Sequence, residues 1–137
     1  MEHVSYKKGY KYQIVEEFQE NIDIRPSEDI DSDYIDLTSE GRLTLKSGYA
    51  WDGPSGPTFD TRNFMRGSLV HDALYQLMRE EHLDREIYRK PADDLLRMMC
   101  RQDGMWWLRA WWVYLAVRWW ADPAADPSHK KPVIHAP

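Results

Sequence analysis

The chain has 137 residues, which is enough for one domain with its own hydrophobic core. Its net charge is −5 at pH 7 and no basic stripe is present to meet phosphates, which excludes a general nucleic-acid binder. Cys100 is the single cysteine, so no internal disulfide can form and stability has to come from packing. We therefore expect synthesis in a reducing cytoplasm. Met1 is not followed by an apolar run, so a signal peptide is not expected.

The first half of the chain has the composition of a β-sheet. Residues 10–15 are typical of a strand, and residues 34–37 and 42–45 alternate apolar and polar side chains around a turn, which predicts a hairpin. The acidic run at residues 28–33 is expected to be a solvated loop, with calcium ligation as the alternative. A loop rich in Gly and Pro follows at residues 48–57.

Three helical patterns occupy the second half, over residues 62–81, 84–102 and 105–121. Pro91 lies inside the second pattern, so that helix is kinked there or begins there. The predicted fold class is α+β, with a small antiparallel N-terminal sheet or hairpin followed by three helices in a single domain, residues 1–121. The tail, residues 122–137, is rich in Pro, Ala and charge, and we expect it to be ordered only where a neighbouring subunit or similar contact holds it.

The first helical pattern contains the sequence His-Asp-Ala-Leu-Tyr among apolar neighbours. His71 and Tyr75 are four residues apart and share one helix face, whereas Asp72 lies about 100° around the helix. Buried polar groups need partners, and Asp93 or Asp94 on the next helix would accept a hydrogen bond from His71. An oriented histidine can act as a general base, with roughly 2.6–3.2 Å between heavy atoms, and the alternative is a purely structural pair. Asp72 would then be available to ligate a cation.

The Gly/Pro loop has two interpretations. Its glycines allow close backbone approach, so loop carbonyls together with Asp72 or Asp52 would suit a hard cation such as calcium. Ser55 lies in the same loop, but no G-x-S-x-G elbow surrounds it to make it a nucleophile. The other interpretation is a rigid turn in which Trp51 is a packing anchor. The glycines are Gly48, Gly53 and Gly56.

The third helical pattern is apolar nearly all round and is interrupted by Arg109 and Arg118. It is too short and too charged for a membrane span, and Trp with Arg is typical of interfaces. Its tryptophans cannot all face one core, so we expect an exposed patch covered by another protein chain, a virion subunit or a second copy. A membrane surface is less favoured by the acidic charge, and core packing alone is the remaining alternative. The tryptophans are Trp106, Trp107, Trp111, Trp112, Trp119 and Trp120.

The order of these motifs resembles a family of small bacteriophage and prophage proteins of unknown function. The shared features are the loop from Trp51 to Pro57, the H-D-x-x-Y helix, an R-x-x-A-D helix ending at Asp93 and a final aromatic helix with Val-Arg. The resemblance runs from about Gly48 to Ala121. It implies a phage origin, with synthesis in the cytoplasm of a bacterial host and a place in the virion as one destination.

A local resemblance concerns the catalytic core of secreted phospholipases of the A-two class. It implies that His71 activates water, that Asp72 and loop carbonyls hold calcium, that Asp93 orients His71 and that Tyr75 supports Asp93. The chain departs from those enzymes by lacking their flanking cysteines and by carrying prolines in the loop.

Three functions from different classes follow from these motifs. The first is a phage-encoded hydrolase with a His-Asp site, acting with or without a metal on an ester or amide of the host envelope. The second is a non-catalytic tail or baseplate component whose His-Asp pair is structural. The third is an inhibitor that binds a host protein.

Overall fold

The chain forms two compact units, one containing the strands and one containing the helices. The computed structural model describes residues 6–7, 12–51 and 62–120. Small antiparallel sheets come first and three packed helices follow, which confirms the α+β class expected from the sequence.

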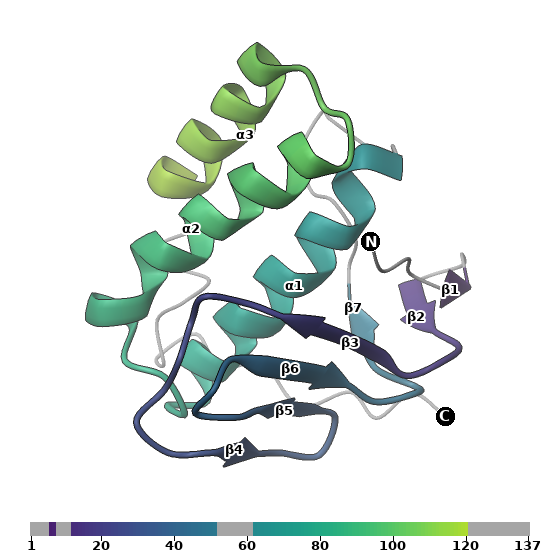
Figure 1. Ribbon diagram of the computed structural model, residues 1–137, viewed down its shortest axis with the longest axis vertical. Coiled ribbons are helices and arrows are strands. Elements are labelled where there is room, and N and C mark those ends of the chain that lie inside the picture. Colours follow the sequence, from purple (N-terminus) through teal and green to yellow (C-terminus); the bar gives the residue numbers. More distant parts are fainter. Residues whose placement is uncertain (1–5, 8–11, 52–61, 121–137) are drawn as a thin grey trace. The chain divides into compact units, whose positions relative to one another are not determined.

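A four-stranded antiparallel sheet forms the larger part of the first unit (Figure 1), in the order β3-β6-β5-β4. Ile35 and Leu37 are buried on either side of half-buried Asp36, and this period of two gives the sheet one apolar face. The predicted hairpin is confirmed, with Leu37 opposite Leu43. The strands are β3 (Phe18–Asn21), β4 (Ile30–Asp31), β5 (Ile35–Leu37) and β6 (Arg42–Leu45).

The turn between β5 and β6 requires a glycine. Gly41 has a φ of +88° and donates a 2.9 Å hydrogen bond to the carbonyl of Thr38. A Cβ at this position would also collide with the carbonyl oxygen of Ile22. The turn that sets the register of the hairpin therefore depends on the absence of a side chain.

A second, three-stranded sheet has the order β1-β2-β7, with β1 (Tyr6–Lys7), β2 (Tyr12–Ile14) and β7 (Ala50–Trp51). The sequence predicted a loop over residues 48–57. This prediction is wrong for the two residues of β7, because Trp51 pairs with Tyr12. Trp51 is buried, as expected of a packing anchor. The acidic run was likewise expected to be all loop, but its residues Ile30 and Asp31 form β4, because the pairing of Ile30 with Leu37 extends the sheet.

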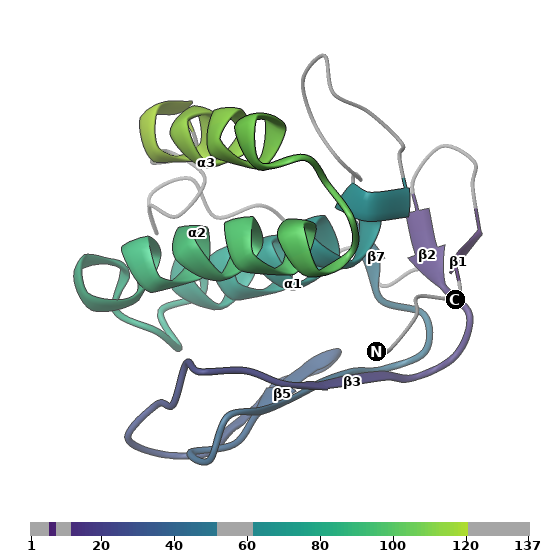
Figure 2. The same ribbon diagram turned by 45° about the horizontal axis from the view of Figure 1, so that its top comes forward.

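The second unit is a layer of three helices, in which α2 lies between α1 and α3 (Figure 2). They are α1 (Arg62–Arg79), α2 (Arg85–Gln102) and α3 (Trp107–Trp120). The side chain of Asp84 caps α2 by accepting a bond from the backbone N–H of Glu86. That cap places the start of α2 before Pro91, which excludes a start at the proline. None of the described helices is both long and apolar enough to cross a membrane.

The helices pack against one another at positions with small side chains. Gly67 of α1 brings the backbone close to α2, because a Cβ there would lie 3.0 Å from Leu96 Cδ1 and 3.2 Å from Cys100 Sγ. α3 packs through a narrow stripe that includes Ala110 and Val113. The stripe meets a buried cluster completed by Phe64, Leu96, Cys100 and Met105.

Candidate functional site

The site expected from the sequence is assembled within the helical unit. α1 carries His71 and Tyr75 on one face, with their ring centroids 4.2 Å apart. His71 Nε2 lies 2.6 Å from Oδ1 of Asp93 on α2, so the expected contact between these two residues is present. Asp94, the alternative partner, instead bonds Lys90 at 3.0 Å on the surface. Their catalytic or structural role stays a prediction.

Asp93 has no exposed surface and accepts hydrogen bonds from three side chains. Besides His71, the Tyr75 hydroxyl donates to Oδ1 at 2.6 Å and Arg118 donates from Nη1 to Oδ2 at 2.9 Å. Burial alone would raise the pKa of Asp93, but the bonds from His71, Tyr75 and Arg118 favour the charged form and hold this pKa below its usual value. Asp93 is therefore a buried carboxylate that stays ionised at neutral pH.

The state of Asp93 fixes the state of its neighbours. Burial, and then the Asp93 charge, raise the pKa of Tyr75 above its ordinary value, so its hydroxyl keeps its proton and donates. An ionised carboxylate only accepts, so His71 presents Nε2–H to Asp93. In neutral His71 the lone pair is then on Nδ1. Within the described part of the chain, Nδ1 makes no hydrogen bond.

The imidazole is close to the surface without being open to it. The side chain of His71 is 11% exposed, whereas that of Asp93 is not exposed at all. A buried acceptor behind a nearly buried imidazole is the order needed to orient a base, and it is equally the order of a well-satisfied structural pair.

Arg118 and Arg89 are site residues that the sequence analysis did not assign. From the sequence, Arg118 was noted only as an interruption of the apolar helix, whereas its guanidinium binds Asp93 and its side chain is 27% exposed. Arg89, one turn before Asp93 on α2, donates to the carbonyls of Val117 and Arg118. It therefore holds the end of α3 against α2. A charged residue in an otherwise apolar helix was the available signal for Arg118.

The proposed cation site is described only in part. Asp72 is half-buried on α1 and already has an interaction within the protein. Gly48 is described, with a φ of +95°, whereas Asp52, Gly53, Ser55 and Gly56 lie outside the described residues. Among the described residues no three His, Cys, Asp or Glu side chains gather as metal ligands. Asp72 by itself does not make a calcium site.

Most of the tryptophans near the end of the chain are exposed, as expected. The exposed fractions are 62% for Trp106, 54% for Trp107, 38% for Trp111, 68% for Trp112 and 77% for Trp119. The side chain of Trp120 lies outside the described residues. Whether another molecule covers these side chains stays a prediction.

Comparison with known proteins identifies a family without a known activity. No curated protein and no solved structure matches the chain. Residues 29–117 match a family described as "Protein of unknown function (DUF1353)". The matched region contains His71, Asp72, Tyr75 and Asp93, and it stops one residue before Arg118. Since the match covers more than half of the 137 residues, the chain belongs to the DUF1353 family.

Proposed function

We propose that the protein is a hydrolase in which His71 is the general base. The observation that carries this proposal is the 2.6 Å contact between His71 Nε2 and an ionised Asp93. It directs the lone pair of the neutral imidazole to Nδ1, where a water molecule can be deprotonated. Tyr75 and Arg118 are positioning residues, because each holds a carboxylate oxygen of Asp93 rather than the imidazole itself.

The reaction is hydrolysis of a carboxylic ester or amide. Nδ1 of His71 removes a proton from water as the water oxygen bonds to the carbonyl carbon. The tetrahedral intermediate then collapses, the bond to the leaving oxygen or nitrogen breaks, and the leaving group takes the proton from His71. Asp93 stabilises the imidazolium that exists between these steps and remains ionised throughout.

The resemblance to phage proteins and to secreted phospholipases suggests where the substrate lies. A phage-encoded esterase of this type would act on an ester or amide of the host envelope, after synthesis in the host cytoplasm or delivery with the virion. The local similarity to phospholipases rests on His71, Asp72, Tyr75 and Asp93, which have the same relative order here.

Hydrolysis of a panel of acyl esters and envelope lipids by purified protein tests this proposal. His71→Ala and Asp93→Asn should each lower the rate by about 10²–10⁴-fold, and added imidazole should partly restore the rate of His71→Ala. Asp94→Asn is the matched control, because Asp94 is an exposed carboxylate on the same helix whose partner among the described residues is Lys90. Equal activity of wild type and His71→Ala would exclude His71 as the base.

Calcium is proposed as an accessory of this site, with Asp72 as its carboxylate. Calorimetric titration of calcium into the wild type should then show binding heat that Asp72→Asn loses, because the substitution removes a negative charge from the ligand set. Magnesium serves as the comparison ion, since it dehydrates reluctantly. Equal heats for both proteins, or no heat in either, would remove calcium from the proposal and leave the His-Asp hydrolase untouched.

The exposed tryptophans favour a second function, that of a non-catalytic virion component in a tail or baseplate. In that case the buried charge of Asp93 and its three donors have only a structural role, which is to stabilise the fold. His71→Ala would then change the free energy of unfolding while no ester in the panel is hydrolysed by the wild type. The same surface would serve an inhibitor of a host protein, which is the third function.

A further inference from the structure

α3 presents a continuous apolar surface to solvent, here named the tryptophan face. Residues advance about 100° around a helix, so the exposed apolar residues of α3 fall within a single arc of about 140°. Arg118 falls in the same arc, but its guanidinium turns to Asp93. The face consists of Trp107, Leu108, Trp111, Trp112, Leu115 and Trp119.

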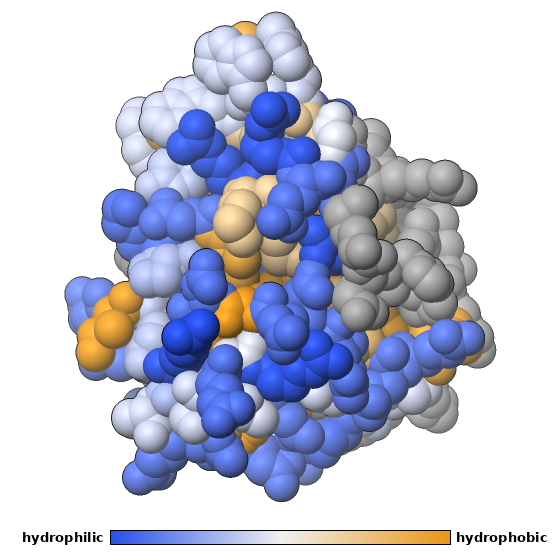
Figure 3. Space-filling view, viewed as in Figure 1, coloured by the Kyte–Doolittle hydropathy of each residue, from blue (hydrophilic) through white to orange (hydrophobic). Residues whose placement is uncertain are grey.

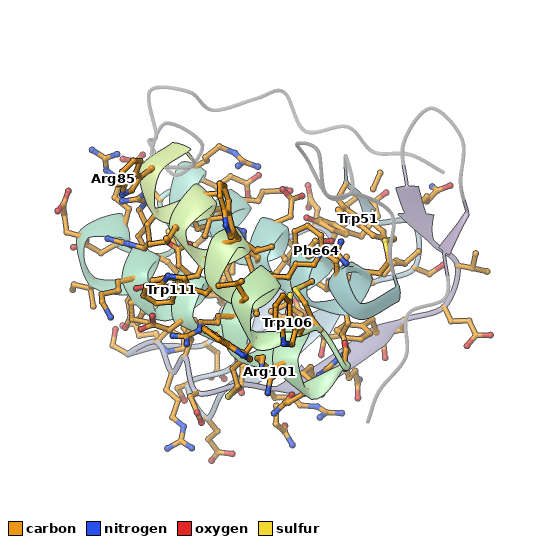
Figure 4. The ribbon with its side chains drawn as sticks, turned by 90° about the horizontal axis from the view of Figure 1, so that it is seen from above. Trp51, Phe64, Arg85, Arg101, Trp106 and Trp111 are labelled. Carbon is orange, nitrogen blue, oxygen red and sulfur yellow. The ribbon has the colours of Figure 1, made fainter. Side chains whose placement is uncertain are left out.

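The inward stripe of α3 is made of smaller residues than the outward face. Ala110 and Val113 are buried, with Val117 packed against the same cluster. Figure 4 shows Phe64, from that cluster, and Trp111 on different sides of α3. A solvent-facing helix surface normally carries polar side chains. In an isolated protein the largest apolar side chains of α3 would therefore face solvent, where polar ones are expected.

The edge of the tryptophan face is ordered. The guanidinium of Arg97, on α2, lies 4.7 Å from the ring centroid of Trp111, and that ring stacks on Tyr114 at 5.6 Å. Figure 3 shows the surface over α3 in pale shades, because this hydropathy scale places tryptophan near its middle. The indole of Trp111 is thus held in place before any partner binds, which reduces the entropy lost on docking.

We propose that the tryptophan face binds the same face of a second copy of this chain. An indole side chain can bury about 150–250 Å². The exposed fractions of the four tryptophans in the face therefore amount to roughly 500 Å², and its two leucines add to this. That total approaches the roughly 800 Å² per partner of a standard interface, before any contribution from flanking residues.

Charge favours a second copy over a lipid surface. Apart from Arg118, which is engaged by Asp93, the face contains no charged residue, so two copies would place no like charges against one another within the face. A chain with a net charge of −5 gains no attraction to anionic lipid. In a two-fold arrangement with antiparallel α3 helices, Trp112 lies near the axis and Trp107 faces Trp119 of the other copy.

Sedimentation over a concentration series tests the proposal on the full chain. The wild type should convert from monomer to dimer, and Trp112→Glu should raise the dissociation constant by at least about tenfold. Ile87→Glu is the matched control, because Ile87 is 61% exposed on α2 and lies outside the face. Circular dichroism shows whether each variant is folded, and Trp119→Glu repeats the test at the end of the face.

Three outcomes would overturn the proposal. A wild type that stays monomeric at every concentration has no such interface, and flotation on phosphatidylcholine or phosphatidylglycerol vesicles would then assign the face to lipid. A dimer that survives both Trp112→Glu and Trp119→Glu forms through another surface. A dimer weakened equally by Ile87→Glu does not depend on this face. None of these outcomes bears on hydrolysis by His71.

Discussion

At the scale of single residues, Asp93 is the most constrained group in the helical unit. A carboxylate without solvent contact needs donors for both oxygens, since its desolvation is costly. Oδ1 receives His71 and Tyr75, and Oδ2 receives Arg118. The charge is therefore balanced by one guanidinium and two further donors, which is why Asp93 remains ionised although it is buried.

Removing His71 should destabilise the protein even if it has no catalytic role. His71→Ala withdraws one donor from a buried carboxylate, and we expect the free energy of unfolding to fall by about 1–3 kcal/mol. Urea denaturation measures this. His82→Ala is the control, because His82 is exposed and its nearest carboxylate, Glu80, is 3.9 Å away. Equal losses in the two variants would show that the contact with Asp93 contributes little.

The lowered pKa of Asp93 predicts a loss of stability in acid. In the unfolded chain an aspartate has a pKa of about 3.9. In the folded protein the pKa of Asp93 lies below its usual value. The stability contributed by ionised Asp93 is therefore present above the unfolded pKa and is lost as pH falls through the folded pKa. Urea denaturation of wild type and Asp93→Asn, from neutral pH to below about pH 4, should show their difference shrinking. A constant difference would contradict the prediction.

At the scale of helices, the contact between α1 and α2 is limited by Gly67. A valine there would place its Cβ against Leu96 and Cys100, and its two methyl groups would add to the crowding. We expect Gly67→Val to lower the free energy of unfolding by about 1–3 kcal/mol. Cys100→Ala in the same chain should recover part of this loss, because it removes one of the crowded atoms. Additive effects of the two substitutions would show that the strain is elsewhere.

The helices could be predicted from the sequence because each is long and periodic. Their observed bounds differ by only a few residues from the predicted ones, and α2 continues through Pro91. The strands could be predicted where local alternation was strong, as in β5 and β6, and where the composition was typical of a strand, as at residues 10–15, which contain β2. β3 and β7 depend on pairing with strands that are distant in the sequence, which a local pattern does not encode. β4 pairs with its neighbour β5 but has only two residues, too few to show an alternation.

The same distinction between local and distant contacts applies to the site. His71 and Tyr75 lie on one helix, and the sequence offered two candidate carboxylates on the next helix as the partner of His71. Arg118 is 25 residues beyond Asp93, and its place in an apolar helix signals that its charge needs a partner without identifying Asp93 as that partner. The partner of its guanidinium was therefore not predicted, whereas the exposure of tryptophans near it was.

At the scale of the whole molecule, the chain places its strands before its helices, and Asp93 with its three donors lies in the second unit. The family match includes both units, since it runs from the start of β4 into the last turn of α3. Family membership therefore concerns strands and helices together, whereas a single domain over residues 1–121 stays a prediction.

The three donors to Asp93 come from two helices and the carboxylate from a third, which makes the helical unit cooperative. If α3 separated first, Asp93 would lose its bond from Arg118, and its buried negative charge would keep only the bonds from His71 and Tyr75. Such a partly open state is costly, so it should seldom be populated. We expect amide hydrogen exchange in the buried parts of α1, α2 and α3 to report one common opening free energy. In Arg118→Met that link is cut, and α3 should exchange before the other two helices.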